Sequence, residues 1–227
     1  MLNQPHASGA RPRRRLVAVA LGATTAFVTL AVGPVATADA APVRPAGVAG
    51  NRQSPAVATS ATSTLWARDV YAYTQDPSAF EVYRTQLLAT ADVVAAEFAT
   101  DPLIVRAAFE RADFAHQTAA LAALSQLGVN YRYASSEPGV AFDCSGLTAF
   151  AWRRAGVSIP HQSSSQIGAA PAVDPSTAQA GDLVQYPGHV MLYLGFGDAI
   201  VHAANSASDV ELSHAASRNL RWANPIG

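Results

Sequence analysis

The sequence has 227 residues, of which 50% are hydrophobic and 14% are charged, so the chain can bury the core of one domain or of two small ones. Its formal net charge is -1, and no run of basic residues follows Arg15. Proteins that bind nucleic acids neutralise phosphates with a basic surface, which this composition does not provide. We therefore expect no nucleic-acid partner.

The first forty residues have the three-part layout of a secretory signal peptide. A basic stretch ends at Arg15, residues 16–32 are uncharged, and Ala38-Asp39-Ala40 places small residues around a cleavage position. We predict a signal peptide over residues 1–40, hence an exported protein without stable membrane insertion after cleavage. An uncleaved anchor is the alternative, because the uncharged stretch approaches membrane-spanning length. The arginines also fit a twin-arginine route.

Composition divides the next part of the chain into two segments. Residues 41–64 are rich in Ala, Pro, Ser, Thr and Gly without an apolar period, which predicts a flexible linker. Residues 65–113 are predicted to be helical, because Asp76-Pro77 and Asp101-Pro102 each place an N-cap residue before a proline. With a further helical stretch over 118–127, we expect two or three helices.

After Gly128 the helical pattern gives way to short alternating runs of apolar and polar residues. Together with the helical stretch before it, this part of the chain is predicted to form one domain over residues 114–227. A loop over 131–141 precedes a short helix over 144–155. The alternation predicts antiparallel strands over Asp182–Tyr186, His189–Leu194, Ala199–Ala203, Val210–Leu212 and Leu220–Trp222. Helices followed by a strand meander indicate an α+β fold.

Cys144 is the only cysteine, so an exported chain cannot use it in an intramolecular disulfide. It lies at the predicted start of a helix, directly after Asp143. Free backbone N–H groups at a helix start favour a thiolate over a thiol, and they can also stabilise an oxyanion. The position therefore suits a nucleophile better than an inert buried thiol.

Two histidines can complete such a site. His189 and Met191 share one face of a predicted strand, and a tight turn after it pairs Met191 with His202. His189 then lies diagonally beside His202, within side-chain reach. His189 can act as general base toward Cys144 while His202 orients its ring.

Four blocks of the second half occur in an order and spacing that resemble the NlpC/P60 family of cell-wall cysteine peptidases, of the type that actinobacteria secrete. The resemblance covers roughly residues 114–227, about half of the chain. The blocks are Asp143-Cys144-Ser145-Gly146-Leu147, Gly181-Asp182-Leu183-Val184, Gly188-His189-Val190 and Tyr193-Leu194-Gly195.

The resemblance implies a papain-like α+β core and a secreted or wall-associated enzyme that hydrolyses peptidoglycan stem peptides, next to D-glutamate or diaminopimelate. It implies Cys144 as nucleophile, His189 as base and His202 as the third residue of a triad. Tyr131 matches the aromatic residue beside the nucleophile, and Asp143 and Ser145 flank it in the substrate cleft. No cofactor or metal is expected, and the protein is expected to be a monomer.

The sequence departs from the family pattern at two places. Members often carry Trp-Gly-Gly where this chain has Tyr133-Ala134-Ser135, and many have Pro-Arg where it has Pro160-His161. Neither change touches the three proposed catalytic side chains. Both can reshape the substrate cleft, so the bond that is cut stays open.

Several alternatives remain at this stage. Cys144, His189 and His202, with His214, could bind zinc. The domain could bind the wall without turnover, catalyse amidase or acyl-transfer chemistry, or be held latent by the helical segment. That segment could instead extend the core. We expect His116, His161 and His214 to be solvated or locally bonded.

Overall fold

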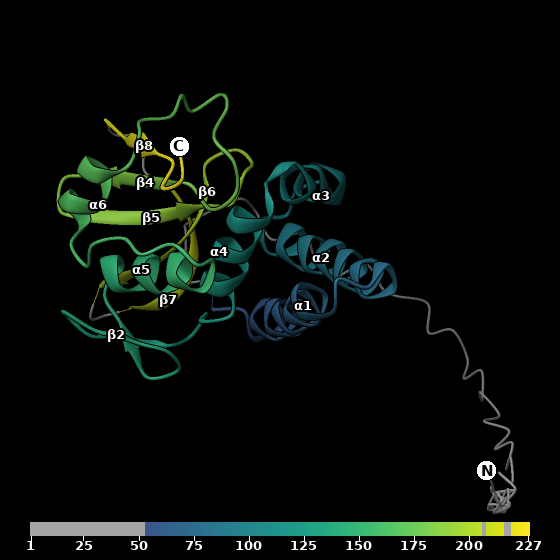
Figure 1. Cartoon of the computed structure of the whole chain (residues 1–227). Coiled ribbons are helices and arrows are strands. Elements are labelled where there is room, and N and C mark those ends of the chain that lie inside the picture. Colours follow the sequence, from purple (N-terminus) through teal and green to yellow (C-terminus); the bar gives the residue numbers. More distant parts are fainter. Residues whose placement is uncertain (1–52, 206–207, 216–218) are drawn as a thin grey trace, which may run out of the picture. The chain divides into compact units, whose positions relative to one another are not determined.

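The computed structural model describes residues 53–205, 208–215 and 219–227, so the predicted signal peptide lies outside the described residues (Figure 1). Four helices come first in the described chain, where two or three were expected. They are α1 (Pro55–Thr74), α2 (Pro77–Phe98), α3 (Pro102–Arg111) and α4 (Phe114–Leu124). None of the described helices combines the length and apolar character that a membrane crossing requires.

Helix α1 begins at Pro55, so the predicted linker over residues 41–64 is wrong from that residue onward. The side chain of Ser54 caps the helix and accepts a hydrogen bond from the N–H of Val57 at 3.3 Å. Val57, Ala61 and Thr64 are buried at helical spacing. The sequence pattern missed the first half of this helix, because its buried face there is made largely of small residues, whereas residues 65–74 fall in the segment predicted to be helical.

Aspartates start the next three helices. Asp76 and Asp101 accept hydrogen bonds from the N–H groups of Ser78 and Leu103, as their Asp-Pro pairs predict. Asp113 accepts from two N–H groups of α4, so this helix begins at Phe114, four residues before the predicted start.

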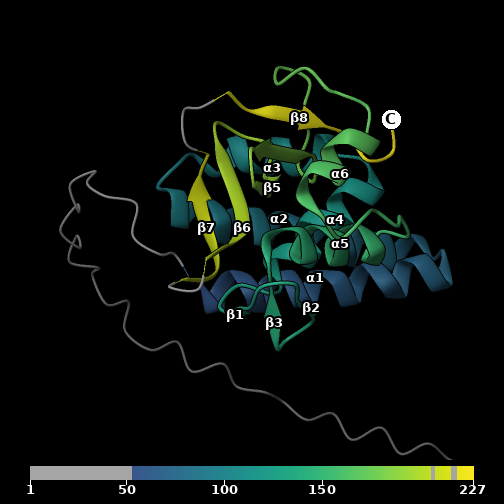
Figure 2. The same ribbon diagram turned by 90° about the vertical axis from the view of Figure 1, so that its left-hand side faces the viewer.

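The second half contains two further helices and two sheets (Figures 1 and 2). The helices are α5 (Cys144–Arg154) and α6 (Ser163–Ala169), of which α6 was not predicted. A three-stranded sheet, ordered β1-β3-β2, is formed by β1 (Asn130–Tyr131), β2 (Ser136–Glu137) and β3 (Ala141–Phe142). It occupies the segment that was predicted to be a loop.

The larger sheet is five-stranded and antiparallel, with the order β7-β6-β5-β4-β8. All five predicted strands are confirmed, with small shifts in their bounds. They are β4 (Leu183–Tyr186), β5 (His189–Tyr193), β6 (Ala199–Asn205), β7 (Ser208–His214) and β8 (Arg221–Ala223). The expected α+β class, with a helix-start cysteine packed on a short antiparallel sheet, is confirmed.

One hydrophobic core joins the N-terminal helices to the sheet. It includes Val57 of α1, Leu87 of α2, Trp152 of α5 and Val190 of β5, each at most 3% exposed. In Figure 1, α1, α2 and α3 lie on the opposite side of α4 from the larger sheet. The helical segment therefore extends the core of the sheet-bearing half.

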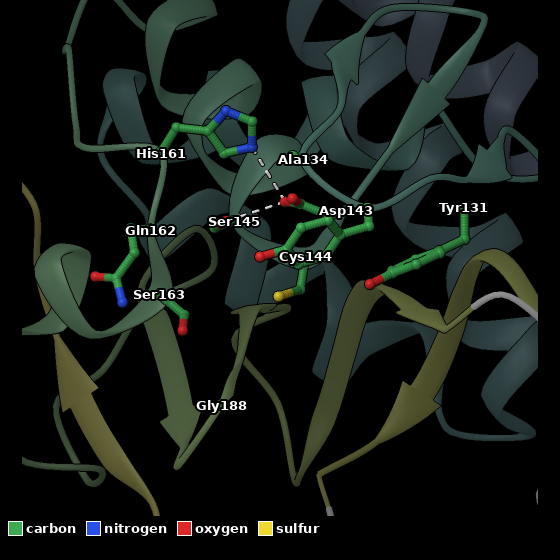
Figure 3. A pocket seen from close by; sticks show the side chains of 10 residues that line it. Tyr131, Ala134, Asp143, Cys144, Ser145, His161, Gln162, Ser163 and Gly188 are labelled. Atoms are coloured by element: carbon green, nitrogen blue, oxygen red, sulfur yellow. Dashed lines mark hydrogen bonds and ion pairs between the residues drawn. The ribbon is translucent and has the colours of Figure 1, made fainter.

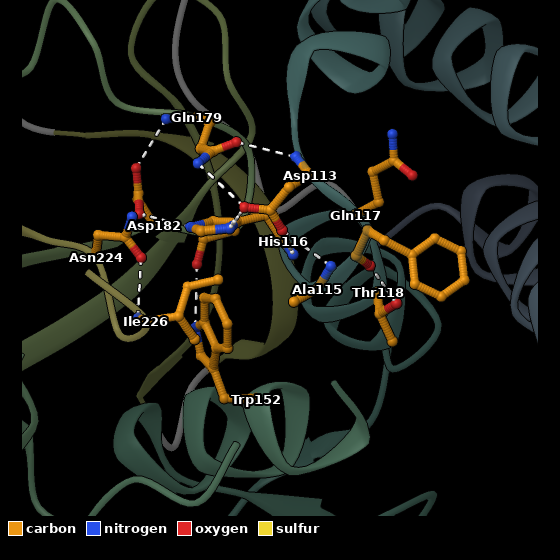
Figure 4. A network of polar contacts seen from close by, with 12 residues as sticks. Asp113, Ala115, His116, Gln117, Thr118, Trp152, Gln179, Asp182, Asn224 and Ile226 are labelled. Carbon is orange, nitrogen blue, oxygen red and sulfur yellow. Dashed lines mark hydrogen bonds and ion pairs between the residues drawn. The ribbon is translucent and has the colours of Figure 1, made fainter. Parts of the chain in front are cut away.

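A buried histidine connects α4 to the sheet (Figure 4). His116 is fully buried, with Nδ1 2.7 Å from a carboxylate oxygen of Asp113 and Nε2 3.0 Å from one of Asp182. Its ring packs edge-on against Trp152, whose Nε1 donates to the carbonyl oxygen of Gly181. The expectation that His116 is solvated or only locally bonded is wrong, because Asp182 reaches it from the sheet.

The two carboxylates decide the charge of His116. Burial lowers the pKa of His116, but the hydrogen bond and charge of Asp182, together with those of Asp113, outweigh burial and raise it. The folded protein therefore binds this proton more tightly than the unfolded chain. Its contribution to stability is complete below the ordinary histidine pKa and is lost as the pH rises through the raised value.

We predict that the free energy of unfolding falls between pH 6.5 and alkaline pH, and that a His116→Gln variant lacks this part of the pH dependence. Urea titrations of both proteins at a series of pH values measure it. Equal pH dependence in the two proteins would contradict the assignment.

Candidate active site

The nucleophile candidate is fixed by the cap of α5. Asp143 precedes the helix, and one of its carboxylate oxygens accepts hydrogen bonds from the N–H of Gly146 at 2.6 Å and the hydroxyl of Ser145 at 3.0 Å. The N–H of Asp143 donates to the carbonyl oxygen of Ser135. Cys144 is therefore the first residue of α5, as predicted.

Gly146 occupies a position where no side chain fits. A Cβ atom at residue 146 would lie 2.0 Å from the carbonyl oxygen of Ser135 and 2.8 Å from Nε2 of His161. The loop between β1 and β2 of the small sheet thus packs directly against the first turn of α5. This close approach explains the glycine two residues after the cysteine.

The two histidines lie on adjacent strands, in the predicted register. Strands β5 and β6 pair Leu192 with Val201 and Tyr193 with Ile200. Nε2 of His189 lies 2.8 Å from Nδ1 of His202, and the rings meet edge-on. The predicted contact between the two imidazoles is confirmed.

Cys144 lies against the strand that carries His189. The backbone N–H groups of Val190, the residue after His189, and of Ser145 at the start of α5 lie close enough to the sulfur to lower the pKa of Cys144. This contact places the thiol beside the first residues of β5.

A cavity of about 300 Å³ opens at the sulfur (Figure 3). Four of the predicted site residues line it, namely Tyr131, Asp143, Cys144 and Ser145. The Tyr131 ring points toward Cys144 in Figure 3. The lining residues are Tyr131, Tyr133, Ala134, Asp143, Cys144, Ser145, His161, Gln162, Ser163 and Gly188. No residue of α1 to α4 lines this cavity, so in the described part of the chain the helical segment does not cover it.

Sequence reasoning missed two side chains at this site. His161 was expected to be solvated or locally bonded, but its Nε2 lies 3.1 Å from a carboxylate oxygen of Asp143, at the cavity. Glu211 was not singled out, yet a carboxylate oxygen lies 3.3 Å from Nε2 of His202. Pairing of β6 with β7 places Glu211 opposite His202, and only that register reveals it.

His214, the fourth candidate zinc ligand, instead contacts Asp198 at the exposed end of β7. Among the residues that the structure describes, no group of three or more His, Cys, Asp or Glu side chains is arranged to hold a metal ion.

The thiol and the imidazole are both shifted toward their neutral forms. Burial raises the pKa of Cys144, and this outweighs the lowering by the N–H groups of Val190 and Ser145. Burial and the neighbouring His202 lower the pKa of His189 to about 4. The expected thiolate is therefore not the resting state, because burial dominates over the helix start.

We predict that Gly146→Ala destabilises the fold by at least about 2 kcal/mol, because the added methyl overlaps backbone that cannot move freely. Gly168→Ala in α6 is the matched control, since a Cβ there meets nothing within 4 Å. The control should be neutral or more stable by up to about 1 kcal/mol. Urea unfolding compares them, and equal stability of the two variants would contradict the close approach.

We also predict that alkylation of Cys144 by iodoacetamide accelerates about tenfold per pH unit between pH 6 and 8, because only the thiolate reacts. Intact-mass spectrometry follows the reaction at this single cysteine. The urea-unfolded chain, whose thiol has its ordinary pKa, is the control and should react faster. A rate that is independent of pH in the folded protein would indicate a resting thiolate instead.

Residues 128–223 match the NlpC/P60 family. Over 90 residues the chain is 42% identical to a probable endopeptidase of Corynebacterium glutamicum, a match covering 38% of this chain and 42% of that protein. Over 105 residues it is 40% identical to the peptidoglycan endopeptidase RipB of Mycobacterium tuberculosis, covering 39% and 43%. The matched part thus spans less than half the length of these curated relatives.

Solved structures with the same family name are also similar. The P60 domain of the antigen MAP1204 from M. avium subspecies paratuberculosis is 29% identical, with a TM-score of 0.45, over 50% of this chain and 96% of that one. RipD of M. tuberculosis, named a non-catalytic NlpC/p60 domain protein, is 25% identical, with a TM-score of 0.43, over 50% and 98%. From the family match and the curated relatives, we conclude that residues 128–223 of this chain form an NlpC/P60 family domain.

Proposed function

We propose that this chain is a cysteine endopeptidase that hydrolyses amide bonds in the stem peptides of peptidoglycan. One arrangement carries the proposal: Cys144 begins α5 at a cavity, against the strand on which His189 is hydrogen-bonded to His202. The matched relatives are named as endopeptidases, and RipB as one that acts on peptidoglycan, which supports the same class of substrate.

In the first half-reaction, the sulfur of Cys144 attacks the amide carbonyl carbon while His189 takes the thiol proton. The pKa of the thiol is raised and that of the imidazole is lowered, so this transfer is unfavourable before attack and accompanies formation of the carbon–sulfur bond. N–H groups at the start of α5 are suited to receive the oxyanion. His189 then protonates the leaving amine, which leaves a thioester on Cys144.

In the second half-reaction, His189 takes a proton from water, which attacks the thioester carbonyl. Collapse of the intermediate breaks the carbon–sulfur bond, and the thiolate regains its proton from His189. His202 holds the His189 ring through the 2.8 Å contact between Nε2 and Nδ1. Tyr131, Asp143 and Ser145 line the cavity and are assigned to substrate binding.

The proposed scissile bond joins D-glutamate to diaminopimelate, and the proposed site of action is the cell wall, reached by export through the predicted signal peptide. The cavity is lined by hydroxyl, carboxylate, imidazole and amide groups from Tyr131, Asp143, His161 and Gln162. Such a lining suits a polar peptide that carries both carboxylate and ammonium groups.

We predict that the protein releases new fragments from soluble muropeptides and that Cys144→Ala releases none. Mass spectrometry of the products identifies the bond from the fragment masses. Cleavage at D-glutamyl–diaminopimelate is the expected result. If the folded wild-type protein with reduced Cys144 releases no fragments but still binds muropeptides, the domain is a binding module and not a peptidase.

We predict that kcat/KM declines on the acid side only near pH 4, because burial and His202 lower the pKa of His189 to about 4. The neutral imidazole is the active base, so activity is retained above this pKa and lost below it. A pH series with a short stem-peptide substrate measures the decline. An acid limb near pH 6.5, the ordinary histidine value, would contradict the buried environment of His189.

A further inference from the structure

Glu211 lies behind the two histidines, one strand further toward the β7 edge of the sheet. It occupies β7 directly opposite His202 of β6. One of its carboxylate oxygens is 3.3 Å from Nε2 of His202, and both side chains are only 12% exposed. The contacts therefore run from His189 on β5 through His202 on β6 to Glu211 on β7.

A carboxylate at this position is costly for the fold. Its second oxygen is buried and has no hydrogen-bond partner among the described residues. Nε2 of His202 is also buried and has no hydrogen-bond partner among those residues, and the Glu211 carboxylate lies 3.3 Å from it. Burial of a charge that has one partner is unfavourable, and an apolar residue in the middle of a strand would be at least as stable. Stability alone does not account for the glutamate.

The tautomer of His202 does account for it. A neutral imidazole carries one proton, which lies on either Nδ1 or Nε2. The negative charge of Glu211, 3.3 Å from Nε2 of His202, favours the proton on that nitrogen and so leaves Nδ1 as an acceptor. Nδ1 of His202 then accepts from Nε2–H of His189, and Nδ1 of His189 stays unprotonated.

We propose that Glu211 is a positioning residue that fixes the tautomers of His202 and His189 and so keeps His189 ready to accept the Cys144 proton. This inference rests on the proposed peptidase function. The negative charge of the glutamate also stabilises the positive charge that develops on His189 during attack, acting across His202. Among the described residues, Tyr186 of β4 is a further titratable group that packs against His189, with 5.1 Å between the ring centroids.

The kinetic test compares Glu211→Leu with Glu211→Gln. Leucine cannot accept a proton, so kcat should fall about 10- to 100-fold with KM unchanged. Glutamine keeps an acceptor oxygen and should restore part of the loss. Asp209→Asn removes the same charge from the same strand and should keep the wild-type kcat, since Asp209 contacts Gln53 instead.

The stability of the Glu211→Leu variant distinguishes a positioning role of Glu211 from a structural role. Glu211→Leu should unfold at a urea concentration equal to or above that of the wild type while its kcat falls. The acid limb of kcat/KM should also move to lower pH, because loss of the carboxylate disfavours the protonated pair. Equal kcat in Glu211→Leu and wild type would overturn the inference, as would a loss of kcat that follows loss of folded protein.

A spectroscopic readout keeps this inference separate from the proposed function. In protein labelled with ¹⁵N-histidine, Nδ1 of His202 should have the chemical shift of an unprotonated ring nitrogen, and Glu211→Leu should shift it toward a mixture of tautomers. The same tautomer in both proteins would overturn the role of Glu211 whether or not muropeptides are cleaved. Absence of Cys144-dependent cleavage together with the expected tautomer change would overturn the peptidase function alone.

Discussion

The candidate site depends on the hydrogen bond between the Asp143 carboxylate and the N–H of Gly146. This bond starts α5 at Cys144 and closes its first turn so tightly that only glycine fits under the carbonyl oxygen of Ser135. The same carboxylate contacts His161 at the cavity, so one side chain both caps the helix of the proposed nucleophile and lines the proposed substrate cavity. The other part of the site is β5, the strand that carries His189, which packs against this fixed start of α5.

Two opposing electrostatic effects meet at the sulfur. The helix start and the N–H of Val190 favour a negative charge, whereas burial disfavours it, and burial dominates. On the other side, burial keeps His189 neutral. At rest Cys144 and His189 are therefore both uncharged, and in the proposed reaction charge develops only as the substrate is attacked. This makes the polar partners behind His189 important, because they must stabilise a charge that is absent at rest.

The fold was predicted best where residues with strong local preferences occur. Asp-Pro pairs marked two helix starts, and alternating apolar residues marked all five strands of the larger sheet. The first half of α1 was missed because alanine and threonine form much of its buried face, and His116 was misassigned because its partner Asp182 lies 66 residues away. At the site, the tight turn between β5 and β6 was enough to predict their register. The position of Glu211 opposite His202 could not be predicted, because it depends on the pairing of β6 with a further strand, β7. Burial of the thiol could not be read from the sequence, since it arises from packing of distant elements.

The partial burial of Cys144 has a consequence beyond the reaction itself. Oxidation of a cysteine by peroxide proceeds through the thiolate and increases with exposure to solvent. A protein that works outside the cytoplasm lacks the reducing systems that would restore an oxidised thiol. Because Cys144 is half-buried and shifted toward its neutral form, it is a poor target for such oxidants. If Cys144 is the proposed nucleophile, the burial that keeps its thiol protonated until His189 accepts the proton also protects it from oxidation between turnovers.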